Sequence, residues 1–491
     1  MNAPQHAWQF RLRRALNWLP LGLAYAFMYM GRYNLTVAQK ALGDKLMPPD
    51  DFGWIFGIGA WVYALSFLIN GPLTDRIGGR RAMLLGTLGT LSANALMGLT
   101  LYGNTHWGWE FPIFGTFVAL YSLNMYFQNF GAIAIVTTKA PWFHVAERGT
   151  FSTIFGVIIS LGIFFAFDWG FAIVEATRGT FKGELGFWAS VFQTLAGTGG
   201  TGVNQNWWLF FAPSILLGTM WIAMALWLRN SPAEAGFSNF ATGEATLSTH
   251  GEREPARAVF LKLWQHPVIR IVCLVEFCSG VLRNGVMHWY PMFAADVGFK
   301  KAFLVTANWG LTLLICGTIG AILTGWCSDK LFQSRRAPMA GICYGLMIGA
   351  VILLMTTLAG NLWYAGIAVI LISTSVIGVH GIFSGTATAD FAGTKNTGAA
   401  VGIVDGMVYL GTGLQAIVIG QIVPQGAAAK VAGNWGWWPT VLLPFTILGL
   451  ILALRIWNAK PQAKATVVSG SDANWQIARG KNDGRGIEPV A

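Results

Sequence analysis

Charged residues are scarce in this chain. Only 11% of its 491 residues are Asp, Glu, Lys or Arg, whereas soluble globular proteins contain about 25%. Hydrophobic residues make up 54%, and they occur in long blocks that short polar segments separate. A helix that spans a bilayer needs about 20 mainly apolar residues. The composition therefore excludes a soluble globular protein and indicates a chain that crosses a bilayer many times.

Cysteines are also few. Their positions in or at the ends of apolar blocks match neither a disulfide framework nor a zinc site. No nucleophile–base pair or metal-ligand spacing stands out elsewhere in the sequence. We therefore expect no metal, no other cofactor and no enzymatic activity. The five cysteines are Cys273, Cys278, Cys316, Cys327 and Cys343.

Hydropathy predicts twelve membrane-spanning helices and therefore an all-α membrane protein. The longest polar segment between spans on the expected cytoplasmic side, 229–266, divides them six and six. We predict an N-terminal half over 1–228, a cytoplasmic linker over 229–266, a C-terminal half over 267–457 and a disordered cytoplasmic tail over 458–491. The predicted spans are 15–38, 52–72, 82–101, 110–136, 149–172, 206–228, 267–294, 302–326, 338–358, 363–388, 398–422 and 436–457.

Basic residues are unevenly distributed between the two sides. With the N-terminus placed in the cytoplasm, the inside segments hold 21 Lys and Arg residues, the outside loops hold 7, and 4 lie within spans. This asymmetry is the positive-inside bias that sets membrane topology. It accounts for the net charge of +11 without a nucleic-acid partner. We expect both termini in the cytoplasm.

The two halves repeat each other. Asp75 and Asp329 follow spans 2 and 8 and lie 254 residues apart, and two arginines, Arg32 and Arg283, lie 251 residues apart in spans 1 and 7. Matching features at nearly one offset indicate two pseudo-symmetric six-helix halves. Membrane transporters built this way form their site at the interface of the repeats, near the middle of the membrane.

Arg32 and Arg283 are the main candidate binding residues. Each lies deep in an apolar span, where an arginine costs about 3 kcal/mol or more unless it faces a cavity or a partner. Two guanidiniums facing one cavity would bind an oxyanion with a two-point geometry that lysine cannot offer. The alternative is that protein carboxylates neutralise them, and Glu276 lies seven residues before Arg283 on the same helix face.

Other intramembrane polar residues extend this candidate site. Tyr25, Tyr29 and Arg32 share one face of span 1, and a buried tyrosine hydroxyl seeks a hydrogen-bond partner. Glu276, Asp405 and His288 are also candidates for proton coupling. The predicted substrate-binding residues are Arg32, Arg283, Tyr25, Tyr29, Tyr63, Gln128, His288, Asp405 and Tyr409.

Two charged joints between helices are candidate gates. Each joint contains a glycine, an acidic residue and several basic residues. These charged residues would form a network that breaks when the conformation changes. The predicted gating residues are Asp75, Arg76, Arg80, Asp329 and Lys330.

At these motifs the sequence resembles the organophosphate:inorganic-phosphate antiporter family of the major facilitator superfamily, which includes glycerol-phosphate and hexose-phosphate transporters. The resemblance covers Arg11 to about Trp457 and is most specific at 25–34, 71–76, 283–291 and 325–330, with shorter matches at 127–128, 147–149 and 409–411. It implies the major facilitator fold, alternating access and an exchange of a phosphorylated organic anion for phosphate. The arginine pair is similar to the phosphate-binding feature of the family.

Three positions depart from the glycerol-phosphate carriers of that family. Tyr33 and Phe67 stand where those carriers have lysine, and Ile159 stands where they have histidine. The resemblance thus implies a small anionic, phosphate-bearing substrate without identifying it as glycerol phosphate. We expect a monomer in a bacterial inner membrane. The alternatives are a membrane sensor of a sugar phosphate and a proton-coupled transporter of another organic anion.

Overall fold

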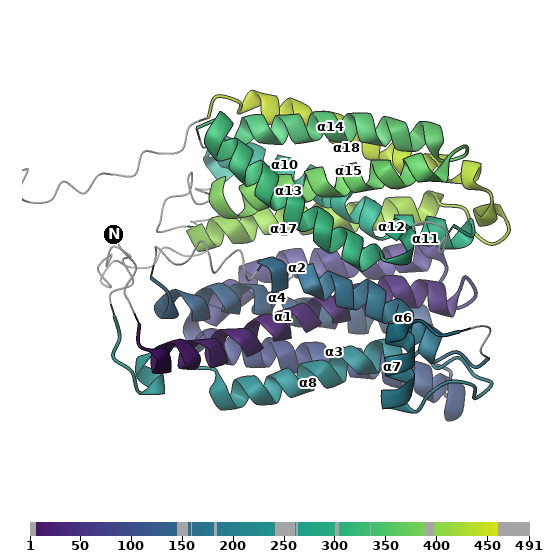
Figure 1. Cartoon of the computed structure of the whole chain (residues 1–491), viewed down its shortest axis with the longest axis horizontal. Helices are drawn as coiled ribbons and strands as arrows, with labels where there is room; N and C mark the ends of the chain where they lie inside the picture. Colours follow the sequence, from purple (N-terminus) through teal and green to yellow (C-terminus); the bar gives the residue numbers. More distant parts are fainter. Residues whose placement is uncertain are drawn as a thin grey trace, which may run out of the picture.

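The structure is a computed structural model, and it describes residues 6–144, 156–158, 160–180, 184–240, 261, 264–299, 304–333, 335–387 and 397–459. All regular elements within these residues are helices. Figure 1 shows two bundles of long, roughly parallel helices, the first half of the chain in purple to teal and the second in green to yellow.

The first bundle contains six long helical segments. The fifth runs over described residues between Gly156 and Ala176 and includes a π-helical turn, η2 (Phe165–Trp169), that continues into α6 (Gly170–Ala176). A short helix, α7 (Phe187–Ala196), packs beside α6. The other five are α1 (Trp8–Leu42), α2 (Pro49–Ile77), α3 (Gly79–His106), α4 (Ile113–Lys139) and α8 (Trp208–Trp227).

The second bundle repeats this arrangement. Two of its six segments are divided, α10 (Pro267–Met287) from α11 (Trp289–Asp296), and α12 (Leu304–Ala307) from α13 (Trp309–Leu331). The other four are α14 (Arg336–Thr357), α15 (Leu362–His380) with its π-helical extension η4 (Gly381–Ala387), α17 (Thr397–Ile422) and α18 (Trp437–Arg455).

The described residues place a helix at each of the twelve predicted spans. By length and composition, nine helices within these residues are apolar enough to cross a bilayer. The remaining three, α1, α4 and α10, are 35, 27 and 21 residues long. Their lower hydropathy comes from polar residues of the candidate site: Arg32 in α1, the buried side-chain amides of α4, and Glu276 in α10.

Two loop predictions differ from the structure. The joint after span 2 is shorter than expected, since α2 continues to Ile77 and α3 starts at Gly79. Only Gly78, with φ of +83°, separates the two helices, and a left-handed backbone favours glycine. The segment 173–205, which lies between the fifth and sixth predicted spans and would be an outer loop, contains the helix α7.

The domain boundaries stay predictions. Within the linker, 241–260 and 262–263 lie outside the described residues, as does the tail from 460 onward.

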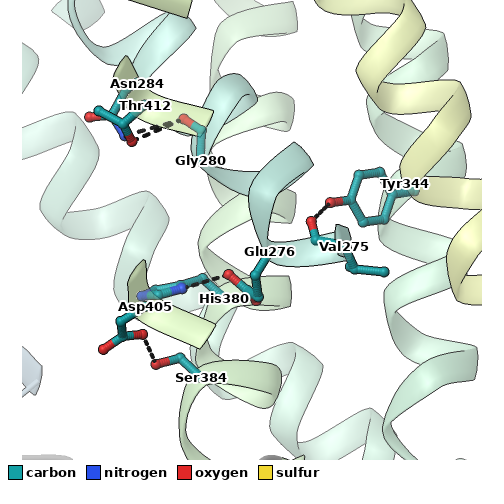
Figure 2. Close-up of polar contacts among 9 residues, drawn as sticks. All are labelled: Val275, Glu276, Gly280, Asn284, Tyr344, His380, Ser384, Asp405 and Thr412. Atoms are coloured by element: carbon teal, nitrogen blue, oxygen red, sulfur yellow. Dashed lines mark hydrogen bonds and ion pairs between the residues drawn. The ribbon is translucent and has the colours of Figure 1, made fainter. Parts of the chain in front are cut away.

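Close helix packing aligns α10 with α17. A Cβ atom added to Gly280 would lie 2.0 Å from the Val408 carbonyl oxygen, and one added to Gly411 would lie 2.1 Å from the Phe277 carbonyl oxygen. Small residues allow such approach between membrane helices. Figure 2 shows the hydrogen bond from Asn284 to Thr412 (2.7 Å) that joins the same helices. These contacts hold the polar faces of α10 and α17 against each other.

Candidate functional site

Arg32 lies at the centre of the site. Its side chain is completely buried. Nε donates a hydrogen bond to Gln128 Oε1 of α4 (2.8 Å), and Nη1 donates to the hydroxyl of Tyr409 in α17. Nη2 has no hydrogen-bond partner among the described residues. The guanidinium therefore joins the two halves of the protein and keeps one donor group available.

Tyrosine rings surround the same guanidinium. Its Cζ lies 4.6 Å from the ring centres of both Tyr29 and Tyr63, 5.3 Å from Tyr409 and 6.0 Å from Tyr33. The ring of Tyr25 packs edge-on against Tyr29, with centres 5.3 Å apart. A cation over an aromatic face gains about 1–2 kcal/mol when it is desolvated. The rings thus stabilise the buried charge without neutralising it.

A chain of side-chain amides fixes the position of Arg32. Gln128 donates to Asn124 Oδ1 (3.0 Å), and Asn124 donates to the carbonyl of Gly31 (2.9 Å). Asn94 also donates to Asn124 (3.1 Å) and accepts from Asn34 (3.1 Å). Because these buried amides connect α1, α3 and α4, rotation of α1 would break several hydrogen bonds at once.

Arg283 of α10 is half-buried and faces the same region. Its guanidinium lies within electrostatic range of Arg32, Tyr29, Tyr33 and Tyr409. Its Nε atom has no hydrogen-bond partner among the described residues. Within the part of the chain that the structure describes, neither arginine forms an ion pair with a carboxylate.

The predicted pairing of Glu276 with Arg283 is not the contact that the structure contains. Glu276 is completely buried. Its Oε2 atom shares a hydrogen bond with His380 Nδ1 of α15 (2.9 Å). Asp405 of α17 accepts from Ser384 (2.6 Å). In Figure 2 the His380 ring lies between the carboxyl groups of Glu276 and Asp405, and it interacts electrostatically with both.

His288 follows Arg283 in the sequence, whereas Glu276 precedes it. Its Nδ1 shares a hydrogen bond with Thr36 of α1 (2.7 Å), and its Nε2 one with Asn284 (3.2 Å). The ring packs on Phe56 of α2, with centres 4.3 Å apart. His288 thus connects the halves and uses both ring nitrogens in doing so.

Further contacts between the halves lie at the end of the bundle where α1 reaches Leu42, here called the Leu42 end. Lys40 forms an ion pair with Asp296 (2.7 Å), and Asp44 accepts from the backbone of Gly426 (2.9 Å). A Cβ atom on Gly53 would lie only 2.5 Å from the Ala416 carbonyl oxygen. The halves therefore pack tightly at this end.

The predicted gating residues lie at the opposite end of the bundle, where α1 starts at Trp8. Asp75 is exposed and has no ion-pair partner among the described residues. Arg80 donates to the carbonyl of Ala225 (2.8 Å). Asp329 pairs with Arg336 (2.6 Å), within one half.

The remaining two, Arg76 and Lys330, are exposed. The Asp329–Arg336 pair itself does not connect the two halves.

The three departures from the glycerol-phosphate carriers bear on the same region. Tyr33 lies beside Arg32 and packs on Phe56 with a centre distance of 6.3 Å. Phe67 packs edge-on against Tyr63, with centres 5.5 Å apart. Ile159 lies outside the described residues. Aromatic rings thus occupy the two described positions at which those carriers would place a lysine.

A hollow of about 350 Å³ elsewhere in the first half is unsuited to an anion. It lies between α3 and α4, and none of the predicted site residues lines it. Its lining is almost wholly apolar: Leu96, Leu99, Thr100, Trp109, Phe111, Thr116, Ala119 and Leu120.

Comparison with known proteins confirms the resemblance predicted from the sequence. The sequence model of the Major Facilitator Superfamily matches residues 21–416. A probable hexose phosphate transport protein of Chlamydia trachomatis is 23% identical, and the alignment covers 93% of each chain. The glycerol-3-phosphate transporter of Bacillus subtilis is 24% identical over 90% of this chain and 92% of its own length.

One further relative is named as a sensor, and one solved structure shows a similar fold. The membrane sensor protein UhpC of Salmonella typhimurium is 24% identical over 87% of this chain and 90% of its own. The crystal structure of a bacterial homolog to the human lysosomal transporter Spinster, inward-facing and unoccupied, aligns with a TM-score of 0.68 at 16% identity. That alignment covers 91% of this chain and 96% of the other.

Proposed function

The chain belongs to the Major Facilitator Superfamily, and we propose that it is a secondary active transporter that exchanges a small phosphorylated organic anion for inorganic phosphate. The observation that carries the proposal is the pair of arginines, one from each half, that have no carboxylate partner among the described residues. Relatives along nearly the whole chain are named as hexose-phosphate and glycerol-phosphate transporters.

An oxyanion between the arginines would complete the hydrogen bonds that this structure leaves open. Nη2 of Arg32 and Nε of Arg283 are buried donors that have no hydrogen-bond partner within the part of the chain that the structure describes. A phosphate group has enough acceptor oxygens for both, and charge-assisted hydrogen bonds to phosphate are short and strong. Gln128 and the tyrosine rings hold Arg32 in place for this contact, which reduces the entropy lost on binding.

The packing of the halves supports alternating access. The excess of Lys and Arg on one side supports a cytoplasmic location for the termini, and hence for the Trp8 end. The Leu42 end would then face outward, and the Lys40–Asp296 pair and the Thr36–His288 hydrogen bond would close it. Transport would require these contacts to break while Asp75 and Asp329 form new ones across the Trp8 end. We place the protein in the inner membrane and expect it to act as a monomer.

One relative favours a second candidate function. The UhpC protein is named as a membrane sensor, so the same arginine site would serve a receptor that binds a phosphorylated compound without carrying it. A proton-coupled transporter of another organic anion is a third candidate, with Glu276 or Asp405 as the proton-binding group. His288 fits that role less well, because both its ring nitrogens already form hydrogen bonds.

Counterflow in proteoliposomes separates these functions. Vesicles that contain the purified protein are loaded with labelled phosphate, and its efflux is followed after addition of external glycerol 3-phosphate, glucose 6-phosphate or unlabelled phosphate. An exchanger releases label only when an external phosphate compound is present. A sensor binds such a compound and releases no label. A proton-coupled carrier that accepts phosphate releases label under an imposed pH gradient with no phosphate compound outside, and one that carries only another organic anion releases no label and binds none of the phosphate compounds.

A further inference from the structure

The site contains two neighbouring groups of ionisable side chains, one basic and one acidic. Arg32 and Arg283 contribute two positive charges without an ion-paired carboxylate in the described residues. The second place, here called the acidic cluster, consists of Glu276, His380 and Asp405. If both carboxylates are ionised, the single imidazole of His380 can balance only one of them.

The acidic cluster has unused hydrogen-bonding capacity. Glu276 is completely buried, and its Oε1 atom has no hydrogen-bond partner among the described residues. Asp405 is half-buried, and its hydrogen bond is to a neutral hydroxyl, that of Ser384. An uncompensated carboxylate inside a membrane protein is costly. A cationic group of a ligand would offset that cost.

The distance between the two places suits a small molecule. Asp405 and Tyr409 lie four residues apart on one face of α17, which corresponds to a rise of about 6 Å. The Tyr409 hydroxyl accepts a hydrogen bond from Arg32, so Tyr409 marks the level of the anion site. Asp405 lies one helical turn closer to the Trp8 end. Arg283 interacts electrostatically with Asp405 without forming an ion pair among the described residues, so the two groups lie within electrostatic range of each other.

We propose that the substrate carries an ammonium group, which Asp405 binds about one helical turn from the anionic head held by Arg32 and Arg283. The inference rests on the proposed function, since it names the class of substrate for that same site. A ligand with a doubly charged phosphate and one ammonium matches the two unpaired guanidiniums and the net charge of the acidic cluster. The substrate class is therefore a small phosphorylated amine, with two or three atoms between its charged groups.

Calorimetric titration of the full-length protein in detergent tests this assignment. The probes are inorganic phosphate, glycerol 3-phosphate and O-phosphoethanolamine, which differ in the group attached to the phosphate. We expect O-phosphoethanolamine to bind about tenfold more tightly than glycerol 3-phosphate, because an ion-paired hydrogen bond replaces a neutral one. In Asp405→Asn that ratio should fall to near one. Asp51→Asn, which removes a carboxylate at the start of α2 at the Leu42 end, is the matched control and should keep the parental ratio.

The outcomes separate the inference from the function on which it rests. Equal affinity of the parent for the two organic compounds overturns the ammonium site, while phosphate binding would still support the anion site. A preference that persists in Asp405→Asn refutes the role of Asp405. If none of the three compounds binds the parent, the proposed function fails and the inference fails with it. The parental comparison needs no variant, so it decides the matter even if Asp405→Asn does not fold.

Discussion

Replacing Arg32 by lysine keeps the positive charge and removes the planar guanidinium. In the structure Nε binds Gln128, Nη1 binds Tyr409, and Nη2 has no partner among the described residues. A lysine has one nitrogen at the end of a flexible chain and cannot hold both partners while it also faces a ligand. We therefore expect Arg32→Lys to bind phosphate compounds much more weakly, although the electrostatic attraction remains.

The size of the effect follows from the hydrogen bonds that are lost. A hydrogen bond to a charged group contributes about 1.5–3 kcal/mol, and each 1.4 kcal/mol corresponds to about a tenfold change in affinity. Loss of one such bond should weaken binding about ten- to a hundredfold. Arg283→Lys should have a similar effect, because its Nε is also a donor without a partner among the residues that the structure describes. The double variant should lose less than the sum, since both arginines act on one ligand.

The measurement is the affinity for inorganic phosphate and glycerol 3-phosphate in detergent, for the parent, both single variants and the double variant. Arg13→Lys is the control. Arg13 lies on the same helix, but it donates to the carbonyl of Trp227 at the Trp8 end, so its replacement should not alter affinity. Near-parental affinity in Arg32→Lys or Arg283→Lys would mean that this arginine has a structural role. The proposal would then rest on the relatives alone.

Three further predictions concern the gates and the acidic cluster. Asp75→Asn should slow counterflow at least severalfold and leave phosphate affinity close to the parental value, because Asp75 is exposed and lies twelve residues after Tyr63, the residue of α2 that contacts Arg32; full transport would exclude a gating role. His380→Ala should destabilise the protein by about 3 kcal/mol, since it leaves the buried Glu276 carboxylate without its partner, and adding Glu276→Gln should restore most of the thermal unfolding midpoint; additive losses would show that the two do not interact. Burial raises the pKa of Asp296, and the opposing effect of Lys40 is smaller. The closed Leu42 end therefore binds a proton more tightly than an open one, so acidification through that pKa should favour closure even though it neutralises the Asp296 partner of Lys40. Distances between spin labels on α1 and α17 at this end measure that shift, which should be absent in Asp296→Asn.

Hydropathy and the charge pattern were sufficient to predict the architecture. A bilayer demands long apolar helices and leaves few alternatives, so the described residues contain a helix at each predicted span. The spacing of 251 residues between Arg32 and Arg283 likewise predicted that they would face one region, and their electrostatic interaction agrees with this. Intramembrane charge is rare enough that its position alone is informative.

The sequence did not predict which polar groups pair. Glu276 and Arg283 share a helix face, yet the Glu276 partner is His380, which is 104 residues away on α15. Pairing between helices depends on their rotation and depth, which a single helix does not encode. The amide chain of Asn34, Asn94 and Asn124 was also missed. A usable signal was present, because Asn124 and Gln128 lie four residues apart in an apolar span.

The guanidinium of Arg32 forms no ion pair among the described residues, and this affects how often a carrier without substrate would reorient. Reorientation of an empty carrier would require the site to close around two arginines that form no ion pair with a carboxylate among the described residues, and sealing such charges from water costs several kcal/mol. With an anion in place that penalty is largely removed. Each kilocalorie of difference slows the empty carrier about fivefold relative to the loaded one. We therefore expect tight stoichiometric exchange with little slippage, so that a cell could hold a phosphate gradient across its membrane without losing it through idle turnover of this protein.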